Sequence, residues 1–89
     1  MTNEMLYQKV LKRLGVSEQE LRSCCRRQGL VDARCLMAAA LMKQPLMTQK
    51  EVARIMGTNQ GTVSKMLTRH ESLMSVDATY RMKWGKINN

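Results

Sequence analysis

The sequence predicts an all-α fold of about six short helices. Leu, Met, Ala, Gln, Arg and Lys dominate the 89 residues, and all of them are good helix formers. Strands are disfavoured because the chain has no Phe, one Trp and two Tyr. Glycines and capping residues recur at short intervals and divide the chain into short segments. This length suits one small domain over residues 1–89 and leaves little room for a second domain or a deep enzyme cleft.

A first helix is expected near the N-terminus. Asn3 can cap it and Gly15 can end it. Between them, Leu6, Val10 and Leu14 recur every four residues. This spacing places the three apolar side chains on one face, so we expect that face to pack against the rest of the protein.

The second and third helices are separated by a basic connector, SCCRRQG (residues 23–29). A capping box, SEQE, opens the second helix, whose clearest core residue is Leu21. Asp32 can cap the third helix, DARCLMAAALMKQ, and Pro45 stops it. The third segment is strongly apolar and rich in alanine, which lets neighbours approach closely. We therefore expect it to be the central and most buried helix.

Three more helices are expected after the proline. A second capping box, TQKE (residues 48–51), opens the fourth helix, which Gly57 ends. Thr58 or Asn59 can cap the fifth, and Asp77 can cap the sixth. The sixth carries an apolar stripe made of Tyr80, Trp84 and Ile87. Its tryptophan is therefore expected to be a packing anchor.

The fourth and fifth helices have the pattern of a helix-turn-helix, at about residues 48–72. In QKEVARIMGTNQGTVSKMLT, the small Ala53 stands where two steeply crossed helices would touch. Gly57 tolerates the positive φ of a tight turn, and Val63 and Met66 can face the first helix. An ordinary helical hairpin with a solvated face is the alternative. In a helix-turn-helix, the second helix enters the major groove of DNA.

The outward positions of the fifth helix suit contacts with base edges. All are polar or small and none is acidic: Asn59, Gln60, Gly61, Thr62, Ser64, Lys65 and Thr68. Asn and Gln can pair bidentately with adenine, Lys can reach guanine, and Ser and Thr donate to phosphates or base edges. Glycine in the first helical turn costs roughly 1 kcal/mol against alanine. Close approach of the backbone to DNA would justify Gly61, and a permissive surface position would explain it equally well.

The charge of the chain favours a polyanionic partner. Fifteen Lys and Arg against seven Asp and Glu give a formal net charge of +8. Basic residues are spread over every helix and no apolar run could span a bilayer, so DNA is expected and a membrane is not. The backbone of DNA is expected to contact helix starts and the side chains of Thr48, Gln49, Lys50, Arg54 and Arg69.

The cysteines and the histidine do not have the spacing of metal ligands. There are three Cys and a single histidine, His70, so no metal or other cofactor is expected. The histidine is expected to be solvated. An odd cysteine count without a signal peptide is typical of the reducing cytoplasm. No nucleophile–base pair, fixed carboxylate pair or phosphate loop is present, so neither an enzyme nor a small-molecule substrate is expected.

From Leu6 to about Lys86, the sequence resembles the C-terminal DNA-binding domain (domain IV) of the bacterial chromosomal replication initiator DnaA. The family patterns are vs-x-x-dL-x-S-K-x-R, aRqiamyL, sl-x-eIG-x-x-fG and D-x-x-fr. The segments that match them in order are VSEQELRSCCR (Val16–Arg26), ARCLMAAA (Ala33–Ala40), TQKEVARIMG (Thr48–Gly57) and DATYR (Asp77–Arg81).

The resemblance implies a Trp-repressor-like helix-turn-helix domain. It implies that Arg26, with Arg27 beside it, enters the minor groove and that Arg34 holds a backbone-contacting or structural position. The family's G-G-R-D-H-T/S-T-V is replaced by GTNQGTV at residues 57–63, without Arg, Asp or His. Those side chains read the initiator's box, so the docking is expected to be shared and the target to differ. We expect a stand-alone domain without the initiator's ATPase.

The sequence thus predicts sequence-specific binding of double-stranded DNA, in replication or in transcription. The alternative is a module that binds a protein partner and uses the same fold without recognising DNA. Weak duplex binding with a flat salt response would favour that alternative. The oligomeric state stays open.

Overall fold

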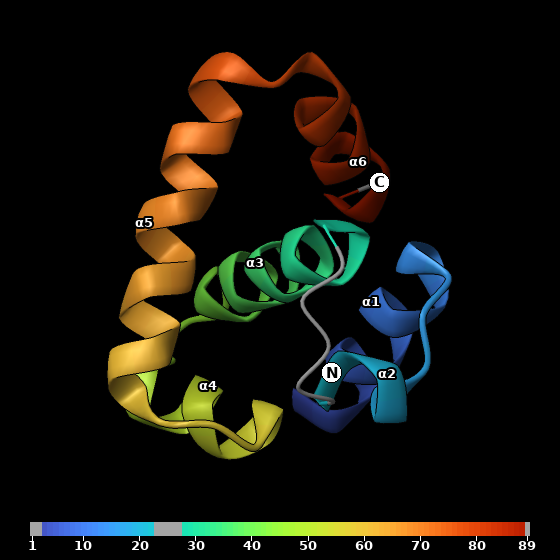
Figure 1. Cartoon of the computed structure of the whole chain (residues 1–89). Helices are drawn as coiled ribbons and strands as arrows, with labels where there is room; N and C mark the ends of the chain where they lie inside the picture. The colour runs from blue at the N-terminus through green and yellow to red at the C-terminus, as the bar shows by residue number, and fades with distance from the viewer. Residues whose placement is uncertain (1–2, 23–27, 89) are drawn as a thin grey trace.

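Five helices pack around a sixth, the central helix α3 (Figure 1). The computed structural model describes residues 3–22 and 28–88, and no strand occurs within them. The helix bounds are α1 Asn3–Leu14, α2 Glu18–Arg22, α3 Gln28–Met42, α4 Gln49–Met56, α5 Gln60–Val76 and α6 Ala78–Asn88. The predicted all-α fold of about six short helices is therefore confirmed.

The core is centred on α3, as its composition predicted. Every residue from Cys35 to Leu41 is buried, and three successive alanines lie within this run. Small side chains let neighbouring helices come close to the α3 backbone, and all five other helices contact it.

The start of α3 corrects one prediction. The helix begins at Gln28, so Asp32 lies in its second turn and does not cap it. Leu30, in the added turn, is 8 % exposed and belongs to the buried apolar residues. Packing of that turn extends the helix upstream of the expected cap. The carboxyl side chain of Asp32 is buried as a result, at 8 % exposure.

Two glycines in the left-handed region end α1 and α4, as predicted. Gly15 and Gly57 both have a φ of 71°. After α4, the Thr58 N–H donates to the Ala53 carbonyl oxygen at 2.9 Å, and the Gly57 N–H donates to that of Arg54 at 3.3 Å. This pair of bonds is the Schellman motif, which satisfies carbonyls that the helix itself leaves unpaired.

Side chains cap the helix starts at the predicted positions. Ser17 and Glu20 bond reciprocally, with distances of 3.1 and 3.3 Å between side-chain oxygen and backbone nitrogen. Thr48 accepts the N–H of the residue three positions on at 3.2 Å, and Asp77 does the same at 3.1 Å. The cap expected at Asn3 lies outside the described side chains.

Helix α5 forms one side of the molecule, and α6 folds back from its end (Figure 1). The sixth helix buries its predicted stripe, because Tyr80 and Ile87 are 1 % and 7 % exposed and Trp84 packs partly buried against the core. Arg13 joins α1 to α6 by donating to the Lys86 carbonyl oxygen at 2.8 Å. Within residues 3–22 and 28–88, no helix has the length and apolar character to cross a membrane.

Candidate nucleic-acid interface

Arg22 of α2 contacts the end of α4, next to the junction between α4 and α5. Its guanidinium donates to the carbonyl oxygen of Ile55, near the end of α4. A Cβ added to Gly57 would lie 3.0 Å from Nη1 of the same arginine. The left-handed backbone therefore favours glycine at this turn, and an added Cβ would also make the end of the Arg22 side chain shift by a few tenths of an ångström.

Helix α5 turns an apolar face to α4 and to the core. Val63 is fully buried, and Met66 and Leu67 pack partly buried against the same cluster. On α4, Val52 is fully buried and Ala53 is 4 % exposed. The predicted apolar contact between these two helices is therefore present, with the small residue buried as expected.

The opposite face at the start of α5 is open. Its exposed residues are Gln60, Gly61, Ser64, Lys65, Thr68 and Arg69, and Thr62 is half-buried beside them. No acidic residue occurs from Gln60 to His70. Two of the exposed side chains are basic, so this face offers hydrogen-bonding groups with a positive charge.

Asn59 caps α5. Its backbone is extended, with φ −109° and ψ 163°, and its Oδ1 accepts from the Thr62 N–H at 2.8 Å and from the Thr62 hydroxyl at 3.0 Å. A carbonyl oxygen has two lone pairs, and both are used here. The bidentate pairing with adenine proposed for Asn59 would therefore break the cap, while its amide N–H groups can still donate.

Thr68 makes a local bond within α5. Its hydroxyl donates to the Ser64 carbonyl oxygen one turn earlier, at 3.1 Å. The proton is engaged in this bond, so Thr68 would meet a ligand as an acceptor.

Gly61 has room for a side chain. Its φ lies outside the left-handed region, and an added Cβ would come within 3.4 Å of the Asn59 Oδ1. Neither the backbone nor the packing of the protein therefore demands glycine at this exposed position.

The residues at α4 that are predicted to contact DNA differ in whether their side chains already form bonds within the protein. Thr48 uses its oxygen as the N-cap, Gln49 is half-buried and Lys50 is exposed. Arg54 donates through Nε to Glu51 at 3.0 Å and also through Nη2. The guanidinium holds the pKa of Glu51 below its usual range, so the carboxylate stays charged and offsets the arginine. Lys50 is then the stronger source of positive potential on α4.

Arg34 belongs to α3, and its side chain reaches the end of α2 and lines a hollow beside α5. It is half-buried, and its Nε donates to the Leu21 carbonyl oxygen at 2.8 Å, which ties α3 to the end of α2. This bond gives Arg34 a structural role. The other predicted minor-groove residues, Arg26 and Arg27, lie outside the described residues.

Two hollows run between α3 and the start of α5. Their volumes are about 310 and 260 Å³, and both are lined by Arg34, Thr62 and Met66. The second is also lined by Lys65 and Arg69. The structure thus brings a basic side chain of α3 next to those of α5, although Arg34 and Lys65 are far apart in the sequence.

The sequence analysis missed a cluster in the second half of α5, around His70. His70 Nδ1 lies 2.7 Å from the Tyr80 hydroxyl, and its ring makes an edge contact with Trp84 at a centroid distance of 4.7 Å. Lys43 covers the indole, with Nζ 5.5 Å from the ring centroid. The expectation of a solvated histidine is wrong, because α6 folds back and places Tyr80 and Trp84 against His70. Partial burial lowers the pKa of His70.

No family model matches this chain, and no curated protein or solved structure matches it either. In the described part of the chain, no three His, Cys, Asp or Glu side chains gather as metal ligands would. The function proposed below is therefore argued from the chemistry of the open face of α5.

Proposed function

We propose that this protein binds double-stranded DNA in a sequence-specific manner, with α4 and α5 as a helix-turn-helix and α5 in the major groove. One observation carries the proposal. The first turns of α5 expose a polar face without an acidic residue, while Val63 on the opposite face is fully buried. A helix held rigidly by its apolar side and open on its polar side is what the major groove admits.

The side chains that we expect to read bases are exposed, and the protein does not use them to cap its own helices. We assign base reading to Gln60, Ser64 and Lys65. Glutamine can pair bidentately with adenine, and lysine can donate to guanine O6 and N7. Asn59, whose oxygen is engaged in the cap, would contact a phosphate through its amide N–H groups.

The DNA backbone would lie against the basic residues around this face. Lys50 on α4 and Arg69 on α5 supply exposed charge, and Arg34 lines the hollow beside them. The sequence resemblance to the DNA-binding domain of the initiator DnaA supports the same docking. The shortened GTNQGTV turn, without the family's Arg, Asp and His, supports a different target.

The test is a selection of bound duplexes from a random pool, followed by fluorescence anisotropy of the selected and a scrambled duplex over a salt series. We expect a defined sequence to emerge and affinity to fall steeply with salt. Lys65→Ala should cost about 1–3 kcal/mol of binding and relax the preference at one base position.

The matched control is Lys9→Ala, which removes an exposed lysine from α1. It should leave the base preference unchanged. Equal losses for the two variants on every duplex would reduce Lys65 to a general attraction and contradict base reading. Weak binding with a flat salt response would favour the protein-partner alternative.

A further inference from the structure

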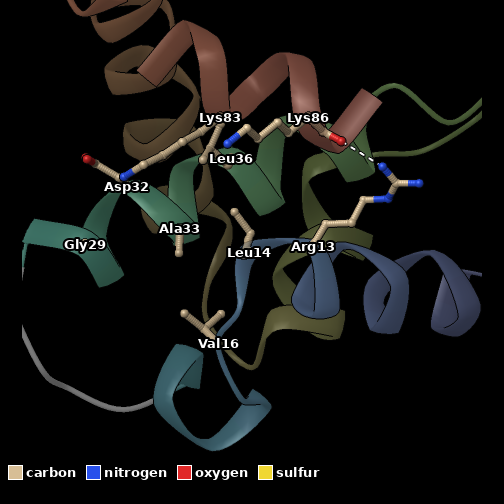
Figure 2. Close-up of a pocket in the computed structure, with 9 residues that line it drawn as sticks. All are labelled: Arg13, Leu14, Val16, Gly29, Asp32, Ala33, Leu36, Lys83 and Lys86. Carbon is tan, nitrogen blue, oxygen red and sulfur yellow. Dashed lines mark hydrogen bonds between the residues drawn. The ribbon is translucent and has the colours of Figure 1, made fainter. Parts of the chain in front are cut away.

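A second basic surface is formed by α1 and α6, on the side of the molecule away from the start of α5 (Figure 1). The two helices contact each other, and Arg13 Nη1 donates to the Lys86 carbonyl oxygen at 2.8 Å, the dashed line in Figure 2. Five exposed cationic side chains make up this α1–α6 surface: Lys9, Lys12, Arg13, Lys83 and Lys86. The bond between the helices holds the two groups of cations next to each other.

The cations of the α1–α6 surface are not paired with carboxylates. Residues 5–14 and 78–88 contain no Asp or Glu. Within the part of the chain that the structure describes, none of the five cations forms an ion pair. Elsewhere, Arg22 and Arg54 each pair with a glutamate one turn earlier in the same helix. Unpaired like charges repel each other, and a bound polyanion relieves that repulsion.

The α1–α6 side carries a larger positive excess than the helices of the proposed reading face. Helices α4 and α5 together contain four basic and two acidic residues, an excess of two. Helices α1 and α6 together contain six basic residues and one acidic residue, an excess of five. DNA bound at α5 alone therefore leaves the larger excess without a partner.

The charged groups of this surface are spread out and do not gather around one point. In Figure 2, the Arg13 guanidinium points away from the crevice between the helices, and the Lys86 ammonium group lies in the opposite direction. On α1, Lys9 lies three and four residues before Lys12 and Arg13, so the three are neighbours on the helix surface. Such a spread fits a backbone of regularly repeated phosphates better than it fits a small anion.

The apolar residues of these helices favour DNA over a lipid surface. Helices that lie on membranes bury an apolar face among the lipids. Here Val10 of α1 and Tyr80 and Ile87 of α6 are buried in the protein core. Among the large apolar side chains described for these two helices, only single methionines are exposed, Met5 and Met82. The surface therefore offers charge without a continuous apolar face.

We propose that the α1–α6 surface binds the backbone of a second DNA segment, so that one protein molecule holds two duplexes. The proposal rests on the function proposed for α5, which binds the first segment. Contacts to phosphates carry no sequence information, so the second segment is bound whatever its sequence. The Cα atoms extend over 29 × 27 × 23 Å, and the body of the protein separates the two duplexes.

The experiment is the retention of one duplex by another through the full chain. A short duplex with the sequence selected by the protein is fixed to beads and saturated with protein. A labelled duplex of unrelated sequence is then added over a salt series. We expect protein-dependent retention that falls steeply with salt. No retention under conditions where the first duplex stays saturated would overturn the proposal and leave the function of α5 standing.

Two triple variants with the same change of charge separate the two surfaces. All six substituted residues are exposed, so both variants should fold, which circular dichroism checks. The α1–α6 variant is Lys12→Gln, Lys83→Gln and Lys86→Gln, and the reading-face variant is Lys50→Gln, Lys65→Gln and Arg69→Gln. The α1–α6 variant should keep its affinity for the selected duplex. Its salt slope for the second duplex should be lower by about three, one for each phosphate contact removed.

The reading-face variant should lose the selected duplex and keep weak, salt-sensitive binding of any duplex. Equal losses of both variants on the selected duplex would reduce the α1–α6 charges to a general attraction and overturn the proposal. Loss of all duplex binding in the α1–α6 variant alone would assign DNA to this surface and contradict the function proposed for α5.

Vesicles that contain phosphatidylserine test the other large anionic partner. We expect no binding of the protein to these vesicles at salt concentrations where the second duplex is retained. Binding to vesicles that the α1–α6 variant loses, without retention of a second duplex, would assign the surface to a membrane and overturn the proposal.

Discussion

The first half of α5 and its second half are stabilised in different ways. At the start, the Asn59 side chain bonds to Thr62 and one fully buried side chain, Val63, faces the core. In the second half, His70 contacts Tyr80 and Trp84, which α6 brings from later in the chain. The first half combines a local cap with packing of Val63 against α4 and the core, whereas the second half is covered by side chains of α6.

Within one helix, the first half therefore exposes the candidate binding face, and the second half is fixed to α6. Because Val63 holds the first half against α4 and the core, and α6 covers the second half, the first half can leave its polar face open without losing its position. Substitutions on the open face should therefore change binding more than stability, and those at the anchor should do the opposite. Four predictions test this comparison.

The largest effect is expected from Tyr80→Ala. Tyr80 is 1 % exposed and also bonds to His70, so truncation leaves a cavity and an unpaired imidazole. We expect a loss of about 3–5 kcal/mol in the free energy of unfolding, as for other buried aromatic residues. Urea denaturation measures it, with the exposed neighbour variant Thr79→Ala as the control. A loss near that of the control would contradict an anchoring role for this end of α5.

The turn before α5 should show the next largest effect. Gly57→Ala places a Cβ in the left-handed region, at a cost of about 1–2 kcal/mol, and 3.0 Å from the Arg22 guanidinium. The matched control is Gly85→Ala, inside α6, where a Cβ meets nothing within 4 Å. The control should stabilise the protein by up to about 1 kcal/mol. If both variants changed the free energy of unfolding in the same direction, the requirement for glycine at the turn would be contradicted.

The outcome at these glycines and caps shows what can be predicted from sequence alone. Gly15, Gly57, Thr48 and Asp77 act as predicted because their partners lie within five residues along the chain. The start of α3 was misplaced because Leu30 packs against neighbours that the local pattern does not identify. Short-range chemistry thus fixes where helices end, and packing can override it.

The candidate interface divides in the same way. Ser64 and Lys65 were predicted on the open face from helical spacing alone, and they are exposed there. The contacts of Arg34 with Leu21 and of His70 with Tyr80 join residues more than one turn apart on different helices. Neither residue type nor spacing indicates those partners, so the roles of both residues became clear with the fold.

Gly61→Ala tests the open face with a smaller effect. The added Cβ fits, at 3.4 Å from the Asn59 oxygen, and alanine should raise the free energy of unfolding by roughly 1 kcal/mol. We expect duplex affinity to fall, because the methyl group occupies space that the DNA needs. Thermal denaturation and anisotropy measure the two changes. A more stable variant with unchanged affinity would make this glycine a permissive surface residue.

The smallest effect is a pH dependence at the anchored end. Partial burial lowers the pKa of His70, and the nearby Glu71 opposes this shift. The unfolded chain, with a histidine pKa of about 6.5, then binds the proton more readily than the folded one. Stability should be complete above that pH and should fall as the pH decreases through the folded pKa.

Melting temperatures between pH 7.5 and 5 measure this dependence. His70 is the only histidine of the chain, so His70→Gln should remove the decline in this range. A decline that persists in the variant would place its origin in another group.

Trp84 also provides a fluorescence probe of the contact between α5 and α6. It is the only tryptophan in the chain, and its ring contacts both His70 of α5 and Lys43. Indole emission responds to nearby charge and to solvent, so the intrinsic fluorescence of the unlabelled protein reports on one place. A spectral change on addition of a duplex would reveal that an event at the first turns of α5 is transmitted along the helix to the contact between His70 and Trp84.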